Sequence, residues 1–206
     1  CINFTEFSIF STFKIRMNSE ASHNYKKISF KLSKNDYLQH LLYSASKTST
    51  VIQKRRRSKI ILPIIYLSVA IFGFIQGNIF LIIAMIVMSA LWYWWFPNWE
   101  RKQYIQQYNK YLVKNMMDEI GKEITLEFSP KEIIQTEKSQ VFQISYYQIR
   151  GWYETSFGVY IGLEDGYTII IPKNGEEEIS EIKSIVFNNN EGIEIQETLD
   201  LDWEWK

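Results

Sequence analysis

The most restrictive feature of this sequence is a long apolar run in its middle. Residues 60–99 carry no charged side chain and consist mainly of Ile, Leu, Val, Phe, Met and Trp. One helix needs about 20 residues to cross a hydrocarbon core of roughly 30 Å, so the run is long enough for two crossings. Its most polar, turn-prone stretch is Gln76-Gly77-Asn78. We therefore expect a transmembrane helical hairpin over 59–99, with spans at 60–75 and 79–96.

The competing interpretation is a pair of core helices in a soluble protein. A helix on the surface of a soluble core needs a polar face, and neither segment has one. The eleven Ile, Leu, Val and Phe residues in 60–75 favour insertion by roughly 3 to 7 kcal/mol. The pattern thus favours membrane spans. Pro63 is expected in the first turn of the first span, and Pro97 is expected to end the second.

The charges predict the orientation of the hairpin. Lys and Arg total 23, as do Asp and Glu, but residues 1–102 hold 14 of the basic and only 4 of the acidic residues. Cations flank both ends of the hairpin and are absent from its turn, so the positive-inside rule places both termini in the cytoplasm of a multi-pass protein of the cell membrane. The expected membrane-interface residues are Lys54, Arg55, Arg56, Arg57, Lys59, Trp92, Trp94, Trp95, Trp99, Arg101 and Lys102. Because no recognition motif accompanies the basic run, we expect no nucleic-acid partner.

The chain before the hairpin consists of two parts, residues 1–24 and residues 25–58. We expect residues 1–24 to be a disordered leader, with a natural start at Met17, while a lipid-modified Cys1 is the alternative. With a single cysteine in the chain, no intramolecular disulfide can form. Residues 25–58 are predicted to hold a short strand at 27–31 and an amphipathic helix at 34–48. A capping box of Ser33 and Asp36 would start that helix.

After the hairpin the periodicity changes from helical to strand-like. A juxtamembrane helix is expected within 100–122, ended by Gly121. Residues 123–188 then show strand-like runs at short spacing, which predicts an antiparallel meander with a hairpin at Asp165-Gly166. Asn174 and Glu177 suit the start of a last helix that would close the sheet with Ile179, Ile182 and Val186. Residues 189–206 form an acidic tail, expected to be disordered, whose Trp203 and Trp205 would dock on a partner.

The order of these parts resembles the YcxB-like family of small bacterial membrane proteins. The resemblance covers residues 28–187 and rests on 124–128 (ITLEF), 152–155 (WYET), 159–161 (VYI) and above all 167–173 (YTIIIPK) with a helix behind it. It implies a C-terminal sheet similar to pleckstrin-homology (PH) domains, a curved antiparallel sheet capped by one helix. The family has no known catalytic residues to place on this chain, and this chain departs from it before Met17 and after Asn188.

Residues that could carry catalysis are scarce. His23 and His40 have no cysteine or paired carboxylate at ligand spacing, and no glycine-rich phosphate loop occurs, so we expect no catalytic, cofactor or metal site. Aromatic residues in the meander could line a binding groove, although aromatic residues in sheets more often serve packing. The residues of this candidate groove are Tyr146, Tyr147, Trp152, Tyr153 and Tyr160.

Together these patterns predict an α+β membrane protein in which a two-helix transmembrane hairpin precedes a PH-like antiparallel domain capped by one helix. The expected role is a non-enzymatic binding or regulatory module at the cytoplasmic face of a bacterial membrane, with the bilayer and one protein as partners. The alternative is an accessory subunit of a transporter or channel that associates through its hairpin, where small residues would allow close helix contact. Those small residues are Ala70, Gly73, Gly77, Ala84 and Ala90.

Overall fold

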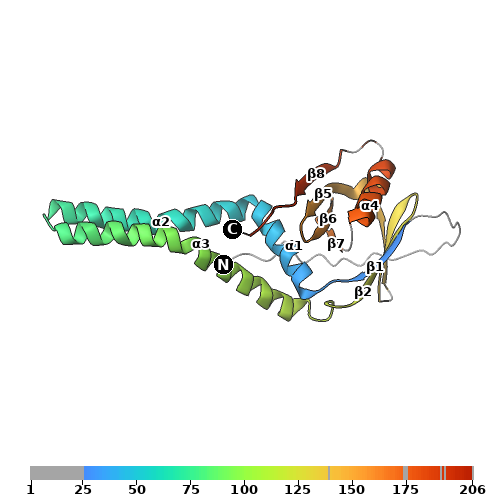
Figure 1. Ribbon diagram of the computed structural model, residues 1–206, viewed down its shortest axis with the longest axis horizontal. Helices are drawn as coiled ribbons and strands as arrows, with labels where there is room; N and C mark the ends of the chain where they lie inside the picture. Colours follow the sequence, from blue (N-terminus) through green and yellow to red (C-terminus); the bar gives the residue numbers. More distant parts are fainter. Residues whose placement is uncertain (1–25, 139, 174–175, 191, 193, 206) are drawn as a thin grey trace.

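The protein has an α+β architecture in which a long helical hairpin extends from a β-rich domain (Figure 1). This computed structural model describes residues 26–138, 140–173, 176–190, 192 and 194–205, without the side chains of 176 and 177. The predicted leader 1–24, with Cys1, Met17 and His23, lies outside the described residues. So do the predicted cap residue Asn174 and the side chain of Glu177. The elements are β1 Lys27–Lys31, α1 Lys34–Lys47, α2 Ser49–Ile75, α3 Ile79–Asn115, β2 Glu123–Phe128, β3 Glu132–Glu137, β4 Gln140–Ser145, η1 Tyr146–Gln148, β5 Ile149–Thr155, β6 Gly158–Leu163, β7 Thr168–Pro172, α4 Glu176–Asn189 and β8 Gln196–Asp200.

The first sheet joins segments from both sides of the hairpin. Its strand order is β1-β2-β3-β4, all antiparallel, and Ile28 of β1 lies opposite Leu126 of β2. Side chains alternate between the two faces of β1, so Ile28 and Phe30 are buried while Lys27 and Lys31 are exposed. Residues 25–58 and 123–188 therefore share one core, although the sequence suggested two separate segments.

The second sheet is mixed rather than purely antiparallel. Its order is β7-β6-β5-β8, and β8 pairs with β5 in parallel, with Gly151 opposite Gln196. The expected hairpin at Asp165-Gly166 connects β6 and β7, and Gly166 has a φ of +85°, which favours glycine. The predicted antiparallel meander therefore describes only part of the observed sheet topology.

Two helices cover the β-rich domain. The capping box of α1 forms as predicted, with Asp36 N–H donating to Ser33 Oγ at 3.3 Å and Ser33 N–H donating to Asp36 Oδ2 at 2.7 Å. The stripe of α4 predicted to close the sheet is buried and packs into the core that includes Trp152. That stripe consists of Ile179, Ile182 and Val186.

Each long helix extends beyond its predicted span at the end nearer the β-rich domain, whereas the ends that flank the turn, Ile75 and Ile79, lie where they were predicted. Pro63 lies well inside α2 instead of in its first turn, and α3 continues through Pro97 to Asn115 instead of ending there. One proline removes one backbone hydrogen bond, and the good helix formers Arg101, Lys102 and Gln103 follow within two turns, so the expectation that Pro97 ends the helix of the second span is wrong. The predicted juxtamembrane helix is the second half of α3, and Gly121, with φ of +79°, follows a turn after its end.

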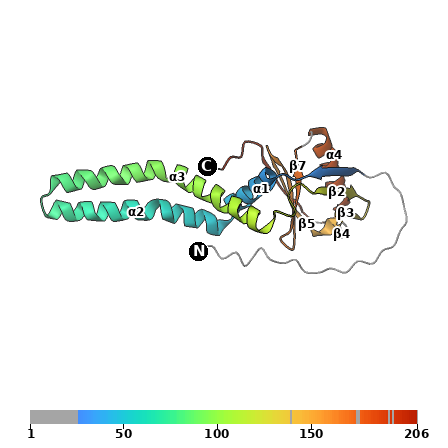
Figure 2. The same ribbon diagram turned by 90° about the horizontal axis from the view of Figure 1, so that it is seen from below.

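Both long helices are apolar and largely uncovered. By length and composition each is able to cross a membrane, and only 11% of the most apolar part of α2 and 6% of that of α3 are buried. Phe74 is 75% exposed and Phe80 is 83% exposed, both near the hairpin tip. The tip points away from both sheets in two perpendicular views (Figures 1 and 2). A core helix of a soluble protein would be mostly covered, and these are not.

The acidic tail is folded over the range that the structure describes, so the expectation of disorder for 189–206 is wrong there. Residues Gln196–Asp200 form β8 on the free edge of β5, and Lys183 of α4 forms an ion pair with Glu197. The strand buries little apolar surface of its own, which is why its local pattern gave no strand signal. Trp203 and Trp205 pack on the chain itself.

Candidate functional site

The predicted basic cluster lies on the first turns of α2, where its residues have different surroundings. Lys54, Arg56 and Arg57 are exposed, whereas Arg55 and Lys59 are half-buried. Lys59 Nζ lies 4.0 Å from the ring centroid of Tyr93 on α3, a cation–π contact. The cluster therefore has an outward-facing part and a part that faces α3.

Arg55 belongs to the inward part and forms the main polar contact between the long helices. Its Nε donates to Glu100 Oε2 at 3.0 Å, and Glu100 is only 9% exposed. The guanidinium also lies 4.5 Å from the ring centroid of Trp205. A poorly exposed carboxylate needs such a partner, because desolvation of an unpaired charge is costly. Sequence reasoning missed Glu100, and its only signal was a carboxylate directly after the charge-free run.

The predicted aromatic belt forms one ring cluster on α3. The ring centroids of Trp92 and Trp95 are 6.3 Å apart, and those of Trp95 and Trp99 are 6.1 Å apart and stacked. Phe96 joins the cluster at 5.2 Å from Trp92, whereas Trp94 is 78% exposed. Trp92, Trp95 and Trp99 thus share one face of α3 at the end of its charge-free half, and Trp94 lies apart from them.

Beside this cluster, α3 carries two outward-facing cations. Arg101 and Lys102 are exposed, and together with Trp95, Asn98 and Ile105 they line a shallow hollow on this helix. Cations next to tryptophan rings at the end of an apolar helix are typical of a membrane–water boundary.

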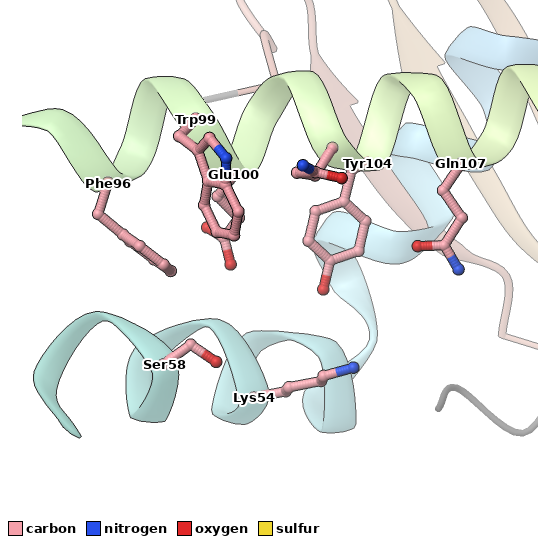
Figure 3. Close-up of a pocket in the computed structure, with 8 residues that line it drawn as sticks. Lys54, Ser58, Phe96, Trp99, Glu100, Tyr104 and Gln107 are labelled. Carbon is pink, nitrogen blue, oxygen red and sulfur yellow. The ribbon is translucent and has the colours of Figure 1, made fainter. Parts of the chain in front are cut away.

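A second hollow lies between α2 and α3 at the same level, and we call it the interhelical groove. Lys54 and Ser58 of α2 face Phe96, Glu100 and Tyr104 of α3 across it, as Figure 3 shows. Its volume is about 280 Å³. The complete lining is Lys54, Ser58, Phe96, Trp99, Glu100, Gln103, Tyr104 and Gln107. The groove combines aromatic walls with hydroxyl, amide and charged groups.

The end of the chain docks next to this groove. Trp205 is 3% exposed and packs in a small cluster with Leu42, Ala45 and Tyr104, with its ring centroid 5.2 Å from that of Tyr104. Trp203 Nε1–H donates to Ser46 Oγ at 3.1 Å. The two tryptophans that sequence reasoning assigned to a partner therefore bind the chain's own helices.

Asp200, the last residue of β8, adds polar contacts to this docking. Tyr43 O–H donates to Asp200 Oδ2 at 2.8 Å, and Lys47 Nζ lies 2.6 Å from the same oxygen. Lys47, with a smaller contribution from Tyr43, holds the pKa of the Asp200 carboxyl below its usual range. The tail thereby ties the second sheet to α1, next to the base of the hairpin.

The candidate groove in the meander is filled by packing. Trp152, Tyr146 and Tyr160 are at most 2% exposed and belong to the main core, so they cannot line an open surface. Tyr153 is half-buried with its ring 6.1 Å from Tyr43, and Tyr147 is 56% exposed. The structure therefore does not bring the five together as a groove, and the packing alternative describes them.

His40 lies in α1 with its ring 5.0 Å from the ring centroid of Tyr160 in an edge-on contact. Burial lowers the pKa of His40 to about 4 from its ordinary 6.5. Among the described residues, no group of three or more His, Cys, Asp or Glu side chains is placed to hold a metal ion. The ring packs against Tyr160, and its protonation should oppose folding.

The pKa of His40 predicts a loss of stability in mild acid. Between about pH 6.5 and pH 4 the unfolded chain binds a proton at His40 that the folded chain does not, so the free energy of unfolding should fall as pH falls, by at most about 3 kcal/mol. His40→Phe should flatten this slope. Amide hydrogen exchange of the strands in detergent, measured across this range, checks it. Equal slopes for wild type and variant would contradict the assignment.

Comparison of the chain with protein-family models, curated proteins and solved structures found no match.

Proposed function

We propose that this chain is a membrane-anchored, non-enzymatic binding or regulatory module. In this proposal α2 and α3 cross the cytoplasmic membrane of a bacterium, and the β-rich domain lies at its cytoplasmic face. The observation that carries the proposal is the bare apolar surface of the hairpin, which extends far from a domain with its own separate core. Leaving that surface in water would be costly, while lipid would solvate it.

The orientation rests on the cations beside the hairpin. Lys54, Arg56 and Arg57 on α2 and Arg101 and Lys102 on α3 are exposed at the domain end, whereas the turn at 76–78 has no charge. The positive-inside rule then keeps the β-rich domain in the cytoplasm and sends the turn across. The tryptophan cluster at this level supports the same boundary.

The YcxB-like resemblance and the PH-like description remain part of this proposal. All pairs among β1 to β7 are antiparallel, within two sheets, and α4 packs its apolar stripe on the core that the sheets share. This arrangement is compatible with a curved antiparallel domain capped by one helix. Strand β8, which pairs in parallel, is an addition to that plan.

The alternative, an accessory subunit that binds a transporter or channel through the hairpin, has less support. Gly73 and Ala70 would admit a neighbouring helix, but both are buried, and a Cβ at Gly73 would lie 3.1 Å from Leu81 of α3. Ala70 and Gly73 therefore already serve the contact within the hairpin, whereas Gly77 and Ala90 are exposed.

Site-specific photo-crosslinking in intact membranes separates the two functions. A photoreactive residue would replace the exposed Tyr147 or Phe142 of the β-rich domain, or Phe72 or Phe80 of the hairpin. The proposal expects one protein crosslinked from the domain positions and only lipid from the hairpin positions. A protein crosslinked only from the hairpin would favour the accessory subunit, and no protein at any position would reject both.

A further inference from the structure

The charged groups of the interhelical groove favour an anionic ligand. Its carboxylate, Glu100, is engaged by Arg55 at 3.0 Å. Within the described parts of the chain, Lys54 forms no ion pair, and its ammonium remains as one uncompensated positive charge on the groove. A ligand of one negative charge would be the complement.

The neutral groups of the groove specify hydrogen-bond acceptors and hydroxyls. Ser58 contributes a hydroxyl, and Gln103 and Gln107 contribute amides that both donate and accept. In Figure 3 the side chains of Ser58 and Gln107 point into the space between the helices. A phosphodiester accepts hydrogen bonds from such donors, and a polyol exchanges them in both directions.

The position of the groove indicates that this anion is a lipid headgroup. Phe96 and Trp99 line the groove and also end the charge-free run, so one end of the groove meets the apolar half of the hairpin. With the hairpin in a bilayer, this is the level of the headgroups. A volume of about 280 Å³ is small for a ligand pocket and suits a headgroup whose acyl chains lie outside along the helices.

From these observations we propose that the interhelical groove binds the headgroup of an anionic glycerophospholipid, of which phosphatidylglycerol is the simplest example. Lys54 and Ser58 hold the phosphodiester, and the amides of Gln103 and Gln107 hold the headgroup hydroxyls. Trp99 packs on the glycerol-ester region. This inference rests on the proposed function, because it requires the hairpin to lie in a membrane.

The test is lipid retention by the full-length protein, measured by native mass spectrometry in mild detergent. Phosphatidylglycerol or phosphatidylcholine is added at matched concentrations to wild type, Lys54→Gln and the control Arg56→Gln. Both substitutions remove one exposed cation from α2, but Arg56 does not line the groove. Loss of one charge-assisted contact should weaken phosphatidylglycerol binding about tenfold in Lys54→Gln and little in Arg56→Gln.

Three outcomes would overturn the groove assignment. Equal weakening of phosphatidylglycerol binding by the two substitutions would mean diffuse electrostatic attraction. Equal retention of phosphatidylcholine and phosphatidylglycerol would mean that the groove does not select for charge. Displacement of the lipid by millimolar inorganic phosphate would mean a phosphate site instead of a lipid site. A second variant, Ser58→Leu, fills the groove without changing charge and should also reduce retention; unchanged retention would overturn the assignment too. Carbonate extraction of membranes from the expressing cells separates this failure from failure of the proposed function, because a chain released by carbonate never lay in the bilayer.

Discussion

Arginine at the middle of both apolar helices is expected to abolish stable membrane insertion of this protein. Leu67 and Val87 lie near the centres of 60–75 and 79–96 and are 47% and 49% exposed. On the insertion scale each change from an aliphatic residue to arginine costs roughly 3 to 4 kcal/mol at the helix centre. The double variant Leu67→Arg/Val87→Arg therefore loses about 6 to 8 kcal/mol, comparable with what the apolar residues of one span contribute.

The same double variant distinguishes a membrane hairpin from a soluble one. If the helices lay in water, arginine at two half-exposed positions would change stability by about 0.5 kcal/mol at most for each site and would improve solubility. Carbonate extraction of membranes from expressing cells measures the outcome, with Gln106→Arg, an exposed site on the second half of α3, as the matched control. Wild type and control should stay in the pellet and the double variant should not. A double variant that remains in the carbonate-resistant pellet would contradict the hairpin model.

Replacement of Trp152 by alanine should remove most of the stability of the β-rich domain. The side chain is fully buried on β5, opposite Ile161 of β6 and Glu197 of β8, with its ring 6.1 Å from that of Phe187 on α4. Truncation of a buried tryptophan to alanine costs about 3 to 5 kcal/mol, out of the roughly 5 to 15 kcal/mol typical of a folded domain. The residue joins the β6, β8 and α4 neighbours of β5 on one core.

Tyr147 provides the internal control, because it is 56% exposed and follows Tyr146 directly in the same aromatic set. Tyr147→Ala should change stability by no more than about 0.5 kcal/mol. Amide hydrogen exchange of β5 and β6 in the full-length, detergent-solubilised protein reports the opening free energy of the domain separately from the hairpin. Similar protection in Trp152→Ala and wild type would show that Trp152 is not a packing residue.

Local sequence patterns predicted those parts of the fold that depend on near neighbours. The charge-free run with one polar break corresponds to the second half of α2, the turn and the first half of α3. Ser33 and Asp36 form the predicted capping box, and Gly166 forms the predicted hairpin. Each of these signals involves residues within a few positions of one another, so the contacts that produce them are already decided by the chain locally.

The candidate site was accessible to sequence reasoning only in part. Lys54, Trp99 and the other cations and tryptophans were identified from their place beside the apolar run. Glu100 and Ser58 were not, because nothing in a linear sequence says which residue of α2 faces which residue of α3. That pairing depends on the relative rotation of two helices, and only packing decides it.

By itself the sequence determined two apolar helices joined by a tight turn, the positions of strands β1 to β7, and the acidic composition of the tail. Only the tertiary structure decided that β1 pairs with β2 across the whole hairpin, that β8 joins β5 in parallel, and that Trp205 lies beneath Arg55. The reason is that periodicity specifies which face of an element is apolar, whereas its partner is chosen by burial and charge compensation among residues far apart in the chain.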